Sequence, residues 1–331
     1  MQNQEHKCNI HHYIPQFYLR WFTSSVSTTQ KRRLKICWKD KSGDSGNDLI
    51  GDVCQMFKYN TSEQEKYLDK NRDNILSKSL RSVIENSHND DDIYNIKKLI
   101  SYMYTDTPDY RQRIINDAQK SIIKEHDLYN AGNMDFIFGN NIKGKADITI
   151  TAAIAMIDTI MDWQYEIMYF DNQLITSDSP VIIGNDEKIQ DRSQMQIKSD
   201  VKNPNIIVED IVTKRRQIYV DNIVNITKIS FPENTMIYTP LSPNIGFFLL
   251  SSEQAKREFK HGMEMLSAKN IDFYKQVNMH LYIYCNDYIL GNKQELLNET
   301  SEYIRIQNYT QKFQTKERKE QRISKYTTIE I

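Results

Sequence analysis

The chain has 331 residues, enough to bury a sizeable core in one large domain or in two closely packed lobes. Hydrophobic residues make up 39% of the sequence and the mean hydropathy is −0.66, values that exclude a protein built mainly of membrane spans. The formal net charge of −1 excludes a general attraction to nucleic acid or to an anionic membrane, so any such binding has to be local.

Neither a targeting segment nor a membrane span is expected. The longest apolar stretch, residues 148–161, is interrupted by threonines and an aspartate, and the first residues of the chain are polar. We therefore expect a cytoplasmic protein with no membrane partner. The four cysteines contain no C-x-x-C pair and are expected to be reduced; they are Cys8, Cys37, Cys54 and Cys285.

Local signals predict a short helix, a hairpin and then several long helices in the first half. Pro15 fits the first turn of a helix, because its ring fixes a helical φ and its missing N–H costs nothing there. Residues 33–39 and 50–57 are predicted strands, joined by a glycine-containing turn. Apolar spacing and capping residues such as Thr61, Ser62 and Asn89 predict four helices, over residues 61–85, 89–107, 110–128 and 147–168.

The second half has a different character. Short alternating or buried runs predict strands at residues 169–176, 181–183, 206–208, 216–220, 235–238 and 245–250. A polar tract over residues 186–204 is an expected insertion, and further helices are expected from Ser252 or Glu253 and over residues 271–287.

These elements predict an α+β protein that is mostly helical, with a small antiparallel sheet in the second half and the N-terminal aromatic helix packed against it. We expect a single domain over residues 1–331. Its sub-lobes are a helical lobe at 60–168 and a mixed lobe that combines 1–59 with 169–300, followed by a charged tail at 307–331.

The opening segment, His11 to Phe22, provides the first candidate site. On a helix that begins at Pro15, aromatic and aliphatic side chains cover most of the circumference, and only Gln16 and Arg20 share a polar stripe. Arg20 is then a permanent cation on a buried element, and it needs a carboxylate or an anionic ligand. The free N–H groups at the helix start, beside His12, also favour negative charge. The alternative is that Gln16 and Arg20 face water and both histidines are turn residues.

A second candidate is Asp178 in the segment T-S-D-S-P, where a strand ends and the chain turns. We expect Asp178 to meet Arg20, His12 or both, so that the carboxylate orients the imidazole as a general base or completes a metal site. Adjacent residues of an extended arm point to opposite faces, so His12 is favoured over His11 for this pocket. The alternative is that Asp178 is a turn residue bonded to nearby backbone.

Metal binding is predicted on the same residues. Mg²⁺ or Mn²⁺ would take Asp178 and His12 as ligands, with Asp171 as the nearest further carboxylate. A zinc site that starts from Cys8, His11 and His12 lacks a second closely spaced pair.

Other catalytic patterns are weaker. Asp178 with Asp186 and Lys188 matches a nuclease-type triplet that lacks strand context, and the H-H-x-I-P wording resembles an H-N-H nuclease without its downstream residues. The sequence contains no G-x-S-x-G, P-loop or dinucleotide fingerprint. Basic clusters at 31–33, at 214–216 and in the tail are expected to be solvated faces, although they are able to touch phosphates.

Residues 11–22, H-H-Y-I-P-Q-F-Y-L-R-W-F, resemble the opening of the mainly bacterial domain of unknown function 4238 family, which reads H-H-Y-x-P-Q-F-Y-L-R-x-F. The resemblance continues over most of the chain, at T-P-D-Y-R (107–111), L-I-T-S-D-S-P-V (174–181), P-L-S-P (240–243) and around Asn278. Family members tend to have Arg at the position of Asp106 and Asn at that of Ser179. The resemblance implies a shared fold and candidate positions, but no activity. Within these motifs the candidate binding residues are Gln16, Tyr18, Ser177 and Arg111.

Two functions follow as hypotheses. The first is a metal-dependent phosphodiesterase or nuclease that acts on nucleic acid or nucleotides, as a bacterial stress or phage-defence effector. Its predicted catalytic residues are His12, His11, Arg20 and Asp178, with His12 as base and Arg20 holding a phosphate. The second is a non-catalytic recognition or regulatory protein in which the same residues form a structural clasp. Neither the substrate nor any protein partner follows from the sequence.

Overall fold

A computed structural model describes residues 10–23, 34–57, 59–113, 134–136, 142–184, 196–201, 208–210, 215–218, 224–269 and 271–305. Several residues singled out from the sequence lie outside these ranges: Cys8, residues 31–33, Asp186, Lys188, Lys214 and the tail at 307–331. Most of the predicted helix at 110–128 and of the polar insertion at 186–204 also falls outside them.

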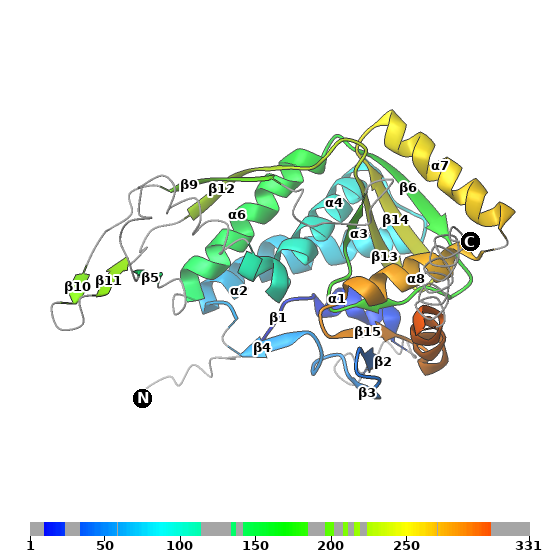
Figure 1. Ribbon diagram of the computed structural model, residues 1–331, viewed down its shortest axis with the longest axis horizontal. Coiled ribbons are helices and arrows are strands. Elements are labelled where there is room, and N and C mark those ends of the chain that lie inside the picture. The colour runs from blue at the N-terminus through cyan, green and yellow to red at the C-terminus, as the bar shows by residue number, and fades with distance from the viewer. Residues whose placement is uncertain are drawn as a thin grey trace, which may run out of the picture.

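The helices form two groups on either side of a central sheet (Figure 1). In the first group, α3 packs on α4, and α4 packs on the long helix α6. The described helical segments are α1 (Gln16–Leu19), η1 (Arg20–Phe22), α2 (Ser62–Leu68), η2 (Asp69–Asp73), α3 (Asn74–Ile84), α4 (Asp90–Thr105), residues 108–113, α6 (Ile142–Ile160), α7 (Glu253–Ala268), α8 (Phe273–Tyr284) and residues 294–305.

Four antiparallel strands form the central sheet, in the order β6 (Gln164–Tyr169), β14 (Ile245–Leu250), β13 (Met236–Ser242) and β8 (Ile182–Gly184). Side chains alternate between its two faces, as the strand period requires. Ile237 and Phe247 belong to the core shared with the first helix group, whereas Tyr238 and Phe248 belong to the core shared with α7 and α8. This sheet confirms the predicted α+β class.

A second four-stranded sheet joins the two ends of the chain. Its order is β3 (Ser45–Leu49), β2 (Lys35–Asp40), β15 (Tyr288–Gly291) and β7 (Thr176–Ser177), all antiparallel. Figure 1 shows β15 beside the early strand β2, which in turn pairs with β3. The predicted strand at 33–39 is present as β2, but its pairing with β15 depends on residues about 250 positions later and has no local signal.

The remaining described strands form three smaller sheets. They are β1 (Ile10–His12) with β4 (Gln55–Phe57), β9 (Gln196–Val201) with β12 (Val224–Ser230), and β5 (Met134–Phe136) with β11 (Arg215–Ile218) and β10 (Val208–Asp210). The pair of β11 and β5 is parallel, whereas the other pairs are antiparallel. The β9–β12 ribbon runs along α6 (Figure 1).

Predicted caps are confirmed where a side chain completes them. Thr61 accepts from the Gln64 N–H and Asn89 from the Asp92 N–H, each in a capping box, and Ser252 accepts from the Ala255 N–H. The predicted helix at 147–168 is wrong at its end, because α6 stops at Ile160 and residues 164–169 pair with β14 instead. The Lys97 ammonium donates to the carbonyls of Met161 and Trp163 just beyond this end.

The opening helix is packed into the core as predicted. Pro15 occupies the position before α1, and Tyr18, Leu19 and Phe22 are fully buried. The Tyr18 hydroxyl lies 2.7 Å from Thr176 Oγ1 on β7 and donates to the Pro240 carbonyl on β13 at 2.7 Å. Through this one side chain the helix is fixed to both large sheets, and its polar stripe is left facing away from them.

Candidate functional site

A cleft of about 770 Å³ lies between the opening helix and the segment that runs from α2 through η2 to α3. One wall is made by β1 and by α1 with η1, and it includes His12, Gln16 and Arg20. The other wall includes Arg72, Lys78 and Arg81. Four cationic and two acidic side chains line the cleft, so its walls carry a net positive charge in a protein that is almost neutral overall.

The first wall follows from the helical spacing of the opening segment. Gln16 and Arg20 lie four residues apart and both face the cleft, while Tyr18 and Leu19 face the core. Phe17 and Trp21, also four apart, are half-buried and line the same cleft. The Nε of Arg20 is buried without a hydrogen-bond partner, and no ion pair joins its guanidinium to any residue that the structure describes.

The second wall is the polar face of an amphipathic helix. Leu76, Leu80 and Val83 of α3 are buried in the core. The cleft receives the opposite stripe at spacings of three and four residues, made of Asn74, Ser77, Lys78, Arg81 and Ser82. Both Lys78 and Arg81 are exposed and have no ion pair within the described part of the chain. Three cations that line the cleft therefore lack a carboxylate partner there.

His12 is held at the cleft by backbone. Its Nε2 lies 3.0 Å from the Gly51 carbonyl oxygen, which assigns the proton to Nε2 and leaves Nδ1 as the acceptor. The Gln16 amide nitrogen lies 3.0 Å from Nε2, with which it forms no hydrogen bond while Nε2 carries the proton, and 3.4 Å from Nδ1, to which it is able to donate. Burial lowers the pKa of His12 below its ordinary value, although the bond to Gly51 opposes this shift. The lowered pKa favours the neutral imidazole, which is able to accept a proton.

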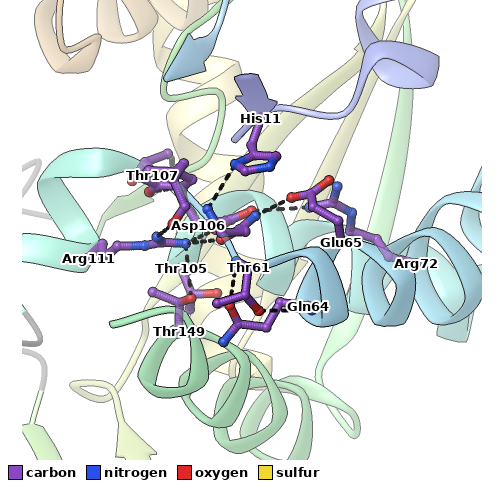
Figure 2. Close-up of polar contacts among 12 residues, drawn as sticks. His11, Thr61, Gln64, Glu65, Arg72, Thr105, Asp106, Thr107, Arg111 and Thr149 are labelled. Atoms are coloured by element: carbon purple, nitrogen blue, oxygen red, sulfur yellow. Dashed lines mark hydrogen bonds and ion pairs between the residues drawn. The ribbon is translucent and has the colours of Figure 1, made fainter. Parts of the chain in front are cut away.

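His11 points to the opposite side and belongs to a buried polar network (Figure 2). Its Nδ1 accepts the backbone N–H of Asn60 at 3.1 Å, and the Asn60 side chain accepts from Arg111 at 2.9 Å and donates to Glu65 at 2.5 Å. This agrees with the alternation expected of an extended arm. His11 also touches the cleft but is only 7% exposed.

An ion cluster made of Arg72, Asp106 and Arg111 lies at the centre of that network. Figure 2 shows the two arginines reaching Asp106 from opposite sides. The Arg72 Nη1 lies 3.1 Å from one carboxylate oxygen of Asp106 and the Arg111 Nη2 lies 2.8 Å from the other. Arg111 also donates to the Tyr59 carbonyl at 2.7 Å, and its guanidinium lies 3.4 Å from the centre of the Tyr59 ring. Arg111 is thus committed to the interior.

Arg72 links this cluster to the cleft. It lies in the π-helical turn η2, its Nε contacts Asp73 at 2.6 Å, and it lines the cleft beside Glu65. A π turn inserts an extra residue into a helix and redirects the side chains around it. The two acids of the cleft are both engaged, since Asp73 pairs with Arg72 and Glu65 accepts from Asn60.

The structure places Asp178 elsewhere. Its fully buried carboxylate accepts the backbone N–H groups of Asn286, Asp287 and Tyr288, at 2.8, 2.7 and 3.3 Å. Burial raises the pKa of Asp178 to about 6, against the effect of these three bonds. The predicted meeting of Asp178 with His12 or Arg20 is therefore wrong: the carboxylate is used to join β7 to the segment before β15.

The predicted site residues thus fall into two groups. His12, Gln16 and Arg20 come together at the cleft, whereas His11 touches it but directs its ring into the buried network. Tyr18, Ser177, Asp178 and Arg111 are buried and are not among the residues that line it; the Ser177 hydroxyl accepts the Ser179 N–H at 3.1 Å. The catalytic and binding roles assigned to all eight residues stay predictions.

The predicted metal ligands do not fit a metal site. Both Asp178 oxygens already accept backbone N–H groups, so this side chain has little capacity left for Mg²⁺ or Mn²⁺. Within the described ranges, no group of three His, Cys, Asp or Glu side chains is placed to hold an ion. A metal requirement stays a prediction.

Sequence reasoning missed the second wall. Lys78 and Arg81 carry a signal, because they continue a polar stripe opposite the apolar stripe of the same predicted helix. Arg72 carries none, since its place depends on a π turn and on Asp106, 34 positions away.

In the part of the chain that the structure covers, no helix has the length and apolar character of a membrane span. Comparison with curated proteins and with solved structures gave no significant match. The family model described as "Protein of unknown function (DUF4238)" matches residues 10–295, from β1 through the start of the last described helix. This match includes both walls of the cleft and both large sheets. The chain therefore belongs to the DUF4238 family of proteins of unknown function.

Proposed function

We propose that the cleft binds a phosphate ester of a nucleotide or nucleic acid, and that His12 acts on it as the general base of a phosphodiesterase or nuclease. The observation that carries the proposal is Arg20, which has no ion pair among the described residues and whose Nε is buried without a hydrogen-bond partner there, in the cleft that His12 also lines. A buried donor and an unpaired cation both cost free energy, and an oxyanion would satisfy both at once.

The charge around Arg20 supports an anionic ligand. Lys78 and Arg81 face the same cleft from α3, and neither pairs with a described carboxylate. Arginine binds phosphate through parallel N–H bonds and lysine binds it as a point charge. Cations gathered in a cleft also attract an anion more strongly than the same cations spread over an open surface.

The state of His12 supports proton transfer. Its Nε2 proton is directed to Gly51, so the neutral ring offers Nδ1 as the base. In the proposed step Nδ1 takes a proton from water, and the water oxygen forms a bond to phosphorus as the bond to the leaving oxygen breaks. That oxygen leaves with the bonding electrons and takes a proton from solvent. Arg20 neutralises charge on the phosphoryl oxygens during this step.

Cleavage assays test the proposal directly. Purified protein is incubated with RNA, single-stranded DNA and nucleotides, with Mg²⁺, with Mn²⁺ or with EDTA, and products are separated by size. We expect cleavage that His12→Gln abolishes and that His261→Gln, an exposed histidine on α7, retains. The EDTA arm decides whether a metal takes part. No cleavage of any substrate, or equal cleavage by wild type and His12→Gln, would contradict the catalytic role.

A second candidate is a protein that recognises the same anion without cleaving it. The observation in its favour is the Gln16 amide, which lies within 3.4 Å of both ring nitrogens of His12 and competes with water for the base. Binding of a phosphate ester without any His12-dependent product identifies this candidate. The proposed setting, a bacterial stress or phage-defence response in the cytoplasm, is part of the proposal and derives from none of these contacts.

A further inference from the structure

The cleft contains flat aromatic surfaces as well as cations, which narrows the class of ligand. Phe17 and Trp21 belong to the core only in part, and their remaining surface lines the cleft next to Arg20. We infer that the ligand is a single-stranded nucleic acid, with its phosphates along α3 and a base stacked on Trp21. This inference rests on the proposed function and names its substrate class.

The available cations of the second wall form a short row on α3. Lys78 and Arg81 are exposed, three residues apart, and both face the cleft. At a rise of about 1.5 Å per residue, they lie roughly 4.5 Å apart along the helix axis. Arg20 faces the same cleft from the first wall, whereas Arg72 is buried and paired with Asp73 and Asp106. A nucleic-acid strand presents phosphates repeatedly along its length and is able to contact cations on both walls.

The aromatic side chains of the first wall, Phe17 and Trp21, complete this arrangement. Proteins that bind single strands combine a cationic groove along the backbone with aromatic side chains on which bases stack. Trp21 and Arg20 are neighbours in η1 and both line the cleft. In a duplex the bases are paired and stacked on one another, so they leave no free face for an indole. The wall therefore favours a single strand over a duplex of the same charge.

An acidic peptide is the main competing ligand, because it also carries repeated negative charge. It has no flat base for Trp21, however, whereas each base of a nucleic-acid strand offers an aromatic face for stacking. The contribution of Trp21 to binding thus separates the two classes of ligand.

Binding experiments use the full chain and fluorescence anisotropy. The probes are a labelled twelve-nucleotide single strand, as DNA and as RNA, a hairpin duplex of the same sequence and a glutamate-rich peptide. We expect the single strand to bind more tightly than the duplex and the peptide. Trp21→Leu should weaken binding of the single strand about tenfold. Trp21→Phe keeps an aromatic face and should restore most of the loss.

Salt dependence tests the cationic row independently of the packing of Trp21. Arg81 is exposed, so Arg81→Gln should fold normally and reduce the slope of log K against log salt by about 0.7, the value for one contact to a single strand. Arg257→Gln, an exposed arginine on α7, serves as the matched control and should leave the slope unchanged.

The outcomes separate this inference from the proposed function. Equal binding of duplex and single strand, preference for the peptide, or no effect of Trp21→Leu and Arg81→Gln overturns the inference. Cleavage of nucleotides that depends on His12, without binding of single strands, overturns the inference and leaves the proposed function standing. Binding of single strands without cleavage supports the inference and overturns the catalytic step. If no phosphate ester binds, both fail.

Discussion

Two groups of charges lie next to each other in this protein and differ in how they are paired. In the ion cluster, Asp106 binds the two buried arginines Arg72 and Arg111. In the cleft, Arg20, Lys78 and Arg81 have no carboxylate partner among the described residues. The first group is paired within the folded chain, whereas the second is the one for which we propose an anion from outside.

The difference separates stability from function. A charge that is buried and paired is costly to lose, because its partner is then left uncompensated. A cation that lines an open cleft without a partner contributes little to folding, and its removal often leaves the protein as stable or more stable. Substitutions in the two groups should therefore affect different measurements.

The largest loss of stability is expected in the ion cluster. Asp106→Asn removes the charge that two buried guanidiniums share, and it should lower the free energy of unfolding by about 4 kcal/mol. Unfolding in guanidinium chloride, monitored by circular dichroism, measures this change. Asp158→Asn, on the exposed face of α6, is the matched control. A loss below about 1 kcal/mol would mean that the ion cluster does not contribute substantially to the stability of the fold.

Asp178 should behave like the cluster and unlike the cleft. Asp178→Ala removes the acceptor of three backbone N–H groups and should cost roughly 2–3 kcal/mol. Asp171→Ala, at an exposed position, should cost much less. Urea unfolding of the two variants measures this difference. If Asp178→Ala is as stable as wild type but loses cleavage activity, Asp178 has a catalytic and not a structural role.

Tyr18→Phe tests the neutral bonds that fix the opening helix. The change removes one hydroxyl, which bonds Thr176 and the Pro240 carbonyl, and it should cost roughly 1–2 kcal/mol. The control is Tyr94→Phe, because Tyr94 is 41% exposed on α4. If both variants melt alike, the hydroxyl of Tyr18 does not hold the helix to the sheets.

Arg20→Gln should change stability by no more than about 0.5 kcal/mol, in contrast to the change in the cluster. The reason is that Arg20 has no ion pair among the described residues, so its loss leaves no partner there uncompensated. The same urea unfolding measures it. A loss as large as that of Asp106→Asn would place Arg20 with the structural charges.

The smallest effect is a pH dependence from His12. Burial lowers the folded-state pKa of His12 below its ordinary value of 6.5. As the pH falls through 6.5, the imidazole is therefore protonated in the unfolded chain before it is protonated in the folded protein. The contribution of His12 to stability is therefore complete above pH 6.5 and is lost on acidification. The free energy of unfolding of His12→Gln should fall less between about pH 7.5 and 5 than that of wild type. Parallel curves would show that His12 titrates normally.

The sequence predicted what depends on near neighbours. Local signals such as Pro15, the capping residues Thr61 and Asn89, and the short apolar run at residues 245–250 act over a few positions, and the elements they predict are present. The end of α6 at Ile160 was missed, because pairing with β14 overrides the helical pattern of residues 164–168.

Only half of the candidate site was predicted, because sequence signals act over a few positions. The spacing of His12, Gln16 and Arg20 is local, and these residues do share a cleft. Asp178 was assigned to the wrong partners, since nothing near it in the sequence reveals that residues 286–288 supply its donors. Arg72 and Asp106 lie 34 positions apart and meet because the fold brings η2 to the residue that follows α4.

We propose that Arg20, which has no ion pair among the described residues, binds an anion in the cleft. The most direct test is the melting temperature of wild type and Arg20→Gln, each with increasing amounts of a twelve-residue oligothymidylate. A ligand that binds only the folded state raises the melting temperature as its concentration rises. We predict equal melting temperatures without the oligonucleotide, a rise for wild type and a much smaller rise for Arg20→Gln. No rise for wild type, or the same rise for both proteins, would contradict the account.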